Sequence, residues 1–223
     1  MSYLIHRAKG TVDLAAAWDS SCWQEAEVAE IEHFRPEGSD HRPHARAKMV
    51  YDDSGLYLHF LVDDCYVLAR HHGYHASVYL DSCVEFFVQP FGRGGYFNFE
   101  QNCGGSRLVY FVRDHTRGPD GMAAYDPLTD EEMGQLTTFH SLPEAVEEEI
   151  TAPVQWRLAM HIPFRVLAGY VGPIATATLP GSVWRGNFYK CADESSHPHW
   201  ASWQPVPQLN FHWPDAFGEL VFA

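Results

Sequence analysis

Four hydrogen-bonding side chains lie on two neighbouring short segments of the sequence: Glu85 on the first segment, and Asn98, Glu100 and Asn102 on the second. Carboxylates accept hydrogen bonds, and primary amides both donate and accept them. A set of this composition can bind the hydroxyl groups of a sugar, can surround a cation such as Ca²⁺, or can supply the two carboxyl groups of a glycosidase. The placement of the two segments decides between these chemistries.

We interpret the two segments, residues 82–89 and 96–102, as the strands of a β-hairpin, because the residues between them are rich in glycine and proline. A turn centred between Gly92 and Arg93 places Glu85 opposite Glu100. The same register pairs Cys83 with Asn102, and Phe87 with Asn98. We therefore expect the four polar residues on one face of the hairpin. The other face is predicted to join the core through Val84, Phe86, Val88, Phe97 and Phe99.

Two carboxylates directly opposite each other have Cβ atoms roughly 5 Å apart, and they repel unless a proton, a cation or a hydrogen-bond donor intervenes. We expect sugar hydroxyls to be these donors. One alternative is a hydrolase that uses Glu85 and Glu100, since glycosidase carboxyl groups stand about 5 to 10 Å apart. Another is a structural polar network, with or without a bound Ca²⁺. Lys190 is a candidate donor to the carboxylates if its strand flanks the hairpin.

Aromatic residues are abundant, with seven Trp, eleven Tyr and fourteen Phe, and several fall between the predicted strands. A sugar ring packs its C–H groups on an aromatic plane while its hydroxyls need polar partners. We therefore predict that Tyr79, Trp200 and Phe211 join the polar residues in one ligand-binding site. Tryptophans within patterned segments are assigned to the core, namely Trp18, Trp23, Trp156, Trp184 and Trp203.

The rest of the chain is predicted to be mostly strands, with weak helical signals. Predicted strands cover residues 49–51, 56–62, 82–89, 96–102, 108–113, 154–163, 184–190 and 217–222. Residues 144–149 are the best helix candidate, and residues 114–143 are expected to form a long surface excursion. Many short strands without helical alternation favour an all-β antiparallel β-sandwich, immunoglobulin-like or jelly-roll-like, with minor helical content. We expect residues 1–223 to form a single domain.

The net charge and the composition of the chain limit the classes of molecule that it can bind. A net charge of −14 opposes binding to nucleic acid and to anionic membranes, whereas neutral sugars fit it. No apolar run is long enough to span a membrane, and the start of the chain lacks the pattern of a secretion signal, so a cytoplasmic protein is expected. Five cysteines without C-x-x-C spacing indicate reduced thiols, rather than a disulfide framework or a zinc site. No cofactor is expected.

Five stretches of the sequence together resemble the family 9 carbohydrate-binding modules, especially stand-alone family 9-like proteins of bacteria. They occur in order from about Asp52 to the C-terminus, with a looser match at residues 12–23. The stretches are Tyr79–Phe87, Tyr96–Asn102, Trp184–Cys191, Pro198–Trp203 and Asn210–Leu220.

The resemblance implies a β-sandwich with a slot between two aromatic planes that grips a mono- or oligosaccharide, notably at a chain end. The planes fall on Tyr79 and Phe211, where the family usually has tryptophan. Glu85 matches an acidic residue at the sugar hydroxyls, Asn102 matches an amide, and Glu100 occupies a position that is basic in some members. Structural Ca²⁺ is implied for some members. The same sandwich also hosts haem-binding and partner-binding domains, which remain alternatives.

Overall fold

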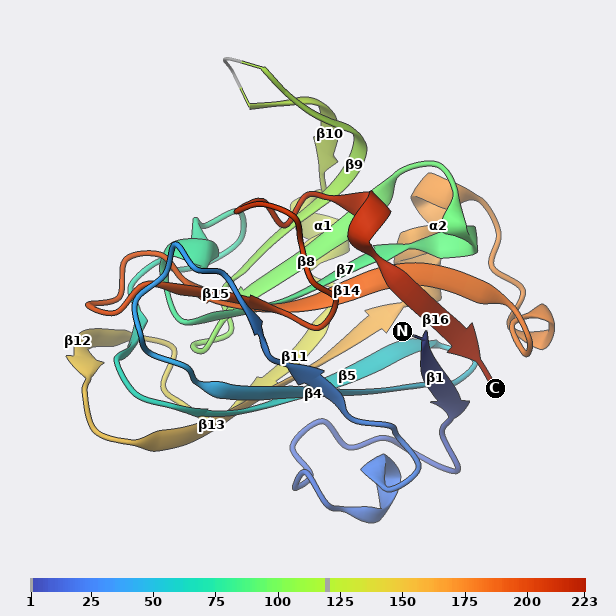
Figure 1. The fold of residues 1–223 in the computed structure, drawn as a ribbon. Helices are drawn as coiled ribbons and strands as arrows, with labels where there is room; N and C mark the ends of the chain where they lie inside the picture. The colour runs from blue at the N-terminus through green and yellow to red at the C-terminus, as the bar shows by residue number, and fades with distance from the viewer. Residues whose placement is uncertain (1, 119–120) are drawn as a thin grey trace.

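Two layers of β-strands enclose the core of the protein (Figure 1). The computed structural model describes residues 2–118 and 121–223. The first layer contains, in spatial order, β10 (Gly121–Pro127), β9 (Arg107–Gly118), β8 (Tyr96–Asn102), β7 (Cys83–Gln89), β14 (Val183–Ala192) and β16 (Gly218–Phe222). The short strands β15 (His199–Ser202) and β3 (His33–Phe34) extend this layer beside β14.

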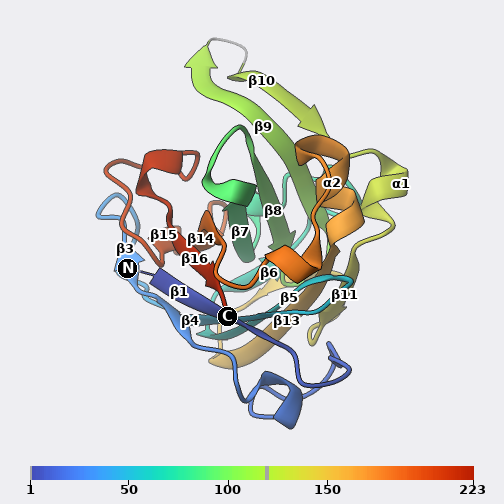
Figure 2. The same ribbon diagram turned by 90° about the vertical axis from the view of Figure 1, so that its right-hand side faces the viewer.

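The second layer contains β2 (Ala29–Ile31), β4 (His44–Tyr51), β5 (Gly55–Asp64), β13 (Val154–Pro163) and β11 (Thr137–His140). Strand β1 (Ser2–Arg7) connects the layers, because its first four residues pair in parallel with β16 and its last two residues pair in parallel with β4. The other pairings within the two layers are antiparallel, which confirms the predicted antiparallel sandwich. Figure 2 shows the layers from the side.

Short helical segments connect the strands. They are the α-helices α1 (Asp130–Met133) and α2 (Phe164–Val171), and the 3-10 turns η1 (Ser21–Trp23), η2 (Val78–Leu80), η3 (Pro90–Gly92), η4 (Thr176–Thr178) and η5 (Pro214–Ala216). Among the described residues, no helix is both long enough and apolar enough to cross a membrane.

The predicted hairpin is confirmed in register and in facing. Glu85 lies opposite Glu100 on β7 and β8. The five apolar residues predicted for the core face, Val84, Phe86, Val88, Phe97 and Phe99, are all fully buried between the layers. Burial of each large apolar side chain contributes about 1.5–3 kcal/mol, so a one-residue slip of this hairpin would expose all of that surface. This cost fixes the polar residues on the outer face.

Two expectations about local structure were wrong, and one helix was missed. Residues 144–149 form no helix; β12 (Val146–Ile150) pairs instead with β6 (Val67–Ala69), and its terminal apolar residues pack toward the core. Residues 114–143 are not a plain surface excursion, because they contain the end of β9 as well as β10, α1 and β11. Helix α2 was not foreseen; it follows β13 directly and buries Phe164, Val166 and Leu167.

Candidate functional site

A cavity of about 490 Å³ opens on the outer face of the first layer, over β7, β8, β9 and β14. Its floor consists of Glu85, Phe87, Glu100, Leu108 and Cys191, which are the outward-facing residues of these four strands. Because side chains alternate along a strand, the burial of Phe86, Phe99 and Val109 in the core turns these floor residues outward. The packing of the sandwich therefore positions the site.

The two floor carboxylates are almost completely enclosed, with 2% of Glu85 and 4% of Glu100 exposed to solvent. The Oε1 atom of Glu85 accepts a hydrogen bond from Cys191 Sγ at 3.2 Å. Glu100 Oε1 accepts one from Asn98 Nδ2 at 2.6 Å, while Asn98 Oδ1 accepts one from the Tyr110 backbone N–H at 2.9 Å. Asn98 thus holds Glu100 in a fixed orientation from beneath the cavity.

Burial shapes the protonation of these carboxyl groups. Desolvation raises the pKa of Glu85 well above its ordinary value, and the nearby Cys191 and Glu100 act in the same direction. Desolvation also raises the pKa of Glu100 to about 7, against the opposing hydrogen bond from Asn98. Asp193, on the cavity wall, has its pKa raised by burial to about 6. Near neutral pH the cavity therefore holds both protonated and ionised carboxyl groups, which can donate as well as accept hydrogen bonds.

Aromatic side chains form the walls on two sides. Tyr79, on η2, is 38% exposed, and Trp200, on β15, donates from Nε1 to Asp193 Oδ1 at 2.6 Å. Phe211 stacks on Tyr189, with ring centroids 4.1 Å apart and an interplanar angle of 15°. The structure thus brings the three aromatic residues predicted for the site, Tyr79, Trp200 and Phe211, to one cavity. A mutually facing pair of rings, Tyr79 and Phe211, stays a prediction.

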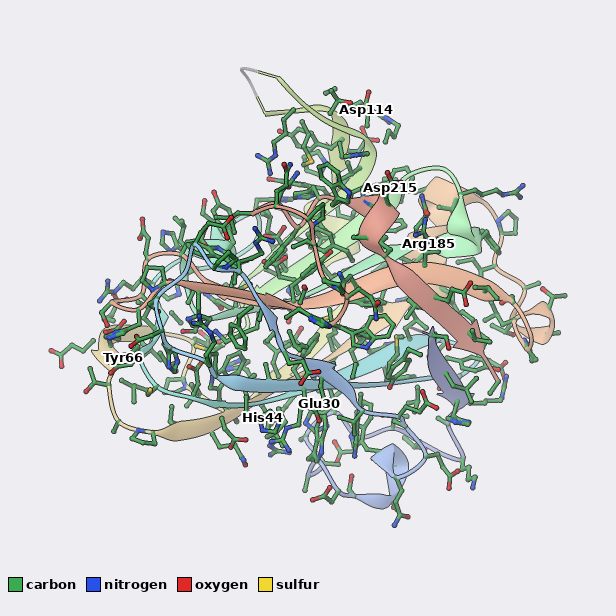
Figure 3. All side chains as sticks on the ribbon, viewed as in Figure 1. Glu30, His44, Tyr66, Asp114, Arg185 and Asp215 are labelled. Atoms are coloured by element: carbon green, nitrogen blue, oxygen red, sulfur yellow. The ribbon has the colours of Figure 1, made fainter. Side chains whose placement is uncertain are left out.

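The remaining walls come from two projecting segments. The β9–β10 hairpin, which rises from the sheet in Figure 1, contributes Tyr110, Arg117 and Met122. The segment between β15 and β16 contributes residues 209–212, and η5 follows it directly. Arg185 Nη2 donates to the backbone oxygens of Asp215 at 3.2 Å and of Phe217 at 2.9 Å. Figure 3 shows Arg185 and Asp215 side by side, so this arginine anchors the end of the segment.

Lys190 does not reach the cavity, and the expectation that it flanks the carboxylates was wrong. It lies between Tyr189 and Cys191 on β14, so strand alternation turns it to the opposite face. There its side chain is fully buried, with Nζ 3.4 Å from Asp64 Oδ2 and 2.8 Å from His199 Nε2. Lys190 therefore belongs to a charged network between the layers.

Asn102 also lies away from the cavity. Its Nδ2 donates to Asp81 Oδ2 at 2.7 Å and to the His71 backbone oxygen at 2.8 Å. Its Oδ1 accepts from the Ser106 backbone N–H at 3.0 Å. These bonds give Asn102 a structural role at the end of β8, and the predicted contact with a ligand has no support in this geometry.

Comparison with known proteins identifies the family. The sequence profile of carbohydrate-binding family 9 matches residues 19–222, which is almost the whole chain. The chain belongs to carbohydrate-binding family 9. No curated protein sequence matches the chain.

Solved structures agree with the family 9 fold. A proposed carbohydrate-binding protein from Bacteroides uniformis ATCC 8492 superposes with a TM-score of 0.84 at 27% identity, over 100% of this chain and 99% of that one. Two structures of a family 9 module from Caldicellulosiruptor kristjanssonii cover 100% of this chain. The glucose complex superposes with a TM-score of 0.60 at 16% identity, and the match covers 96% of the module's chain. The cellotriose complex superposes with a TM-score of 0.61 at 14% identity, and the match covers 93% of the module's chain.

Several cavity residues were missed by sequence reasoning. Arg117 and Met122 lie in the stretch expected to be a surface excursion, and Cys191 and Asp193 follow the predicted end of a strand. Cys191 had a detectable signal, since its spacing from Tyr189 and Asn187 places it on the face opposite Phe188. Arg117 and Met122 had none, because the length of the β9–β10 hairpin depends on its register.

The structural calcium that the resemblance implies for some family members needs oxygen ligands. Across residues 2–118 and 121–223, the one group of three or more His, Cys, Asp or Glu side chains with converging ligand atoms is Cys83, Glu85 and Cys191. Two of its three ligand atoms are sulfur, so this group does not fit calcium.

Proposed function

We propose that the cavity over β7, β8, β9 and β14 binds a sugar unit of a mono- or oligosaccharide without chemical change. The observation that carries the proposal is one cavity that combines exposed aromatic surface with enclosed carboxyl groups. Tyr79 and Trp200 offer planes for the C–H faces of a sugar ring, while Glu85 and Glu100 offer hydrogen bonds to its hydroxyl rim.

The comparisons support this assignment. Family 9 consists of non-catalytic carbohydrate-binding modules, and the C. kristjanssonii module was solved with glucose and with cellotriose. The cavity of about 490 Å³ falls within the range of about 300–1,000 Å³ that is usual for small-ligand pockets. Glucose and short β-glucans are therefore the first ligands to test.

The test is calorimetric titration of the protein with glucose and with cellotriose, comparing Tyr79→Ala with Tyr74→Ala. Tyr74 is a matched control because it is 43% exposed, against 38% for Tyr79, and it lies outside the cavity. We expect wild-type dissociation constants of about 1 mM to 1 μM. Loss of the Tyr79 ring should cost about 1–3 kcal/mol of binding, which is roughly 5- to 150-fold, while Tyr74→Ala should bind normally.

Two results would contradict the proposal. One is the absence of binding across a panel of sugars by the folded wild-type protein. The other is release of reducing sugar from glycans that disappears in Glu85→Gln, because such turnover would make the protein a hydrolase.

A further inference from the structure

Two cysteines lie close to Glu85, Cys191 on the floor of the cavity and Cys83 buried beside it. Cys83 on β7 lies directly opposite Cys191 on β14, and Glu85 is two residues beyond Cys83 on the same face. Both cysteines are free thiols. One ligand atom from each of Cys83, Glu85 and Cys191 can be chosen so that all three lie within 4.8 Å of one another. Cys191 Sγ lies 3.2 Å from Glu85 Oε1.

We propose that Cys83, Glu85 and Cys191 form a binding site for a thiophilic divalent cation, for which Zn²⁺ is the best match. Zinc binds thiolate sulfur at about 2.3 Å and carboxylate oxygen at about 2.0 Å. A tetrahedral arrangement then separates two sulfurs by about 3.8 Å, and a sulfur from an oxygen by about 3.5 Å. The observed cluster, with its three ligand atoms within 4.8 Å of one another, is close to these spacings.

The ligand set selects the metal. Two sulfur ligands disfavour Ca²⁺ and Mg²⁺, which prefer oxygen, and favour zinc and other borderline or soft cations. Three protein ligands leave a fourth coordination position, as in zinc sites that accept water or an external ligand. Glu85 and Cys191 line the cavity, which gives a cation a path to the site.

The charge balance is simple. Zn²⁺ enters, and the thiols of Cys83 and Cys191 and the buried carboxyl group of Glu85 each release a proton to solvent, so that two thiolates and one carboxylate bind the cation. The bound cluster carries one net negative charge. Among the described residues that line the cavity, Arg117 is the one lysine or arginine, and it offers a positive charge to balance this cluster. The strands hold all three ligands, which gives the site a rigid frame.

As a free thiol, each cysteine of the site contacts a backbone oxygen. Cys191 Sγ lies 3.5 Å from the Tyr79 backbone oxygen, and Cys83 Sγ lies 3.6 Å from the Val84 backbone oxygen. Tyr79 is thus tied through its backbone to a proposed metal ligand while its ring lines the cavity. The inference is independent of the proposed sugar binding, because it depends only on the three ligands and their access.

The experiment is a titration of ZnCl₂ into the reduced, chelator-treated protein, with calorimetry for stoichiometry and affinity. Co²⁺ provides a spectroscopic probe, because thiolate ligands give a near-ultraviolet charge-transfer band. The variants are Cys83→Ala, Cys191→Ala and Glu85→Gln. Cys103→Ala is the matched control, since Cys103 is also a fully buried free thiol but lies in the core between the layers.

We expect one Zn²⁺ per wild-type chain, a cobalt–thiolate band, and a melting temperature that rises with zinc. Loss of either cysteine should abolish the cobalt band and weaken zinc binding at least tenfold. Glu85→Gln, which preserves side-chain volume, should weaken zinc binding yet keep the band. Cys103→Ala should bind as wild type. The proposal is overturned if the folded, reduced wild-type protein binds no stoichiometric zinc, or if Cys83→Ala and Cys191→Ala bind it as well as Cys103→Ala does.

Discussion

Replacement of Glu100 by glutamine should stabilise the protein above neutral pH. Glu100 is 4% exposed, and desolvation raises its pKa from 4.5 to about 7 in the folded state. A carboxyl group with a raised folded-state pKa binds its proton more tightly when the protein is folded. Wild-type stability therefore falls as pH rises from about 4.5 to 7, and the deficit persists at higher pH.

The size of the effect follows from the pKa shift. A rise of the pKa from 4.5 to about 7 corresponds to roughly 3–4 kcal/mol, since a tenfold change in proton affinity is worth about 1.4 kcal/mol. Glutamine keeps the volume of the side chain, and its amide oxygen can still accept the hydrogen bond from Asn98 Nδ2. The variant should therefore gain about 3 kcal/mol over wild type at pH 8, and almost nothing at pH 4.

The assay is urea denaturation of both proteins from pH 4 to pH 9, with a chelator present to keep metal ions out. Glu148→Gln is the control, because Glu148 is an exposed glutamate on β12 and its variant should match wild type at every pH. A stability difference for Glu100→Gln that does not change with pH would refute the reasoning. So would a variant that is less stable than wild type at pH 8.

Three further outcomes are expected. Lys190→Met should lower stability by about 3–5 kcal/mol in denaturation experiments, because it leaves the buried Asp64 carboxylate without its cation, while sugar affinity stays unchanged. If the K190M variant were as stable as wild type but bound sugar more weakly, Lys190 would belong to the sugar-binding site after all. Tyr79→Trp should bind sugar equally well or more tightly by calorimetry, since it enlarges an exposed plane, and a tenfold loss would count against stacking at this position. Arg185→Ala should release η5 and weaken sugar binding a few-fold, and unchanged affinity would show that this anchor does not shape the cavity.

The hairpin of β7 and β8 was predictable because its information is local. A glycine-rich turn and a dense apolar face fix the register within about twenty residues of chain, so the opposition of Glu85 and Glu100 followed directly. Lys190 failed for a different reason. Its position was inferred only from the expectation that its strand lies beside the hairpin. Phe188 faces the core, and because side chains alternate along β14, Lys190 must face the core as well.

Contacts between segments that are far apart in the chain could not be predicted from the sequence. The opposition of Cys83 and Cys191 depends on the pairing of β7 with β14, and nothing in either segment specifies that partner. Strand β12 was mistaken for a helix because acidic residues tolerate either conformation when exposed, and the deciding contact is its pairing with β6. Arg117 reaches the cavity only because the β9–β10 hairpin extends far beyond the sheet.

The location of the bound sugar is the most direct test of the central claim. Isotope-labelled protein titrated with glucose or cellotriose and followed by nuclear magnetic resonance reports every backbone amide that senses the ligand. The account predicts saturable shifts concentrated at the walls and floor of the cavity, around Tyr79, Cys191, Trp200 and Phe211. Saturable shifts that cluster on another face of the sandwich, or a spectrum unchanged at sugar concentrations of about 10 mM, above the expected dissociation constants, would contradict it.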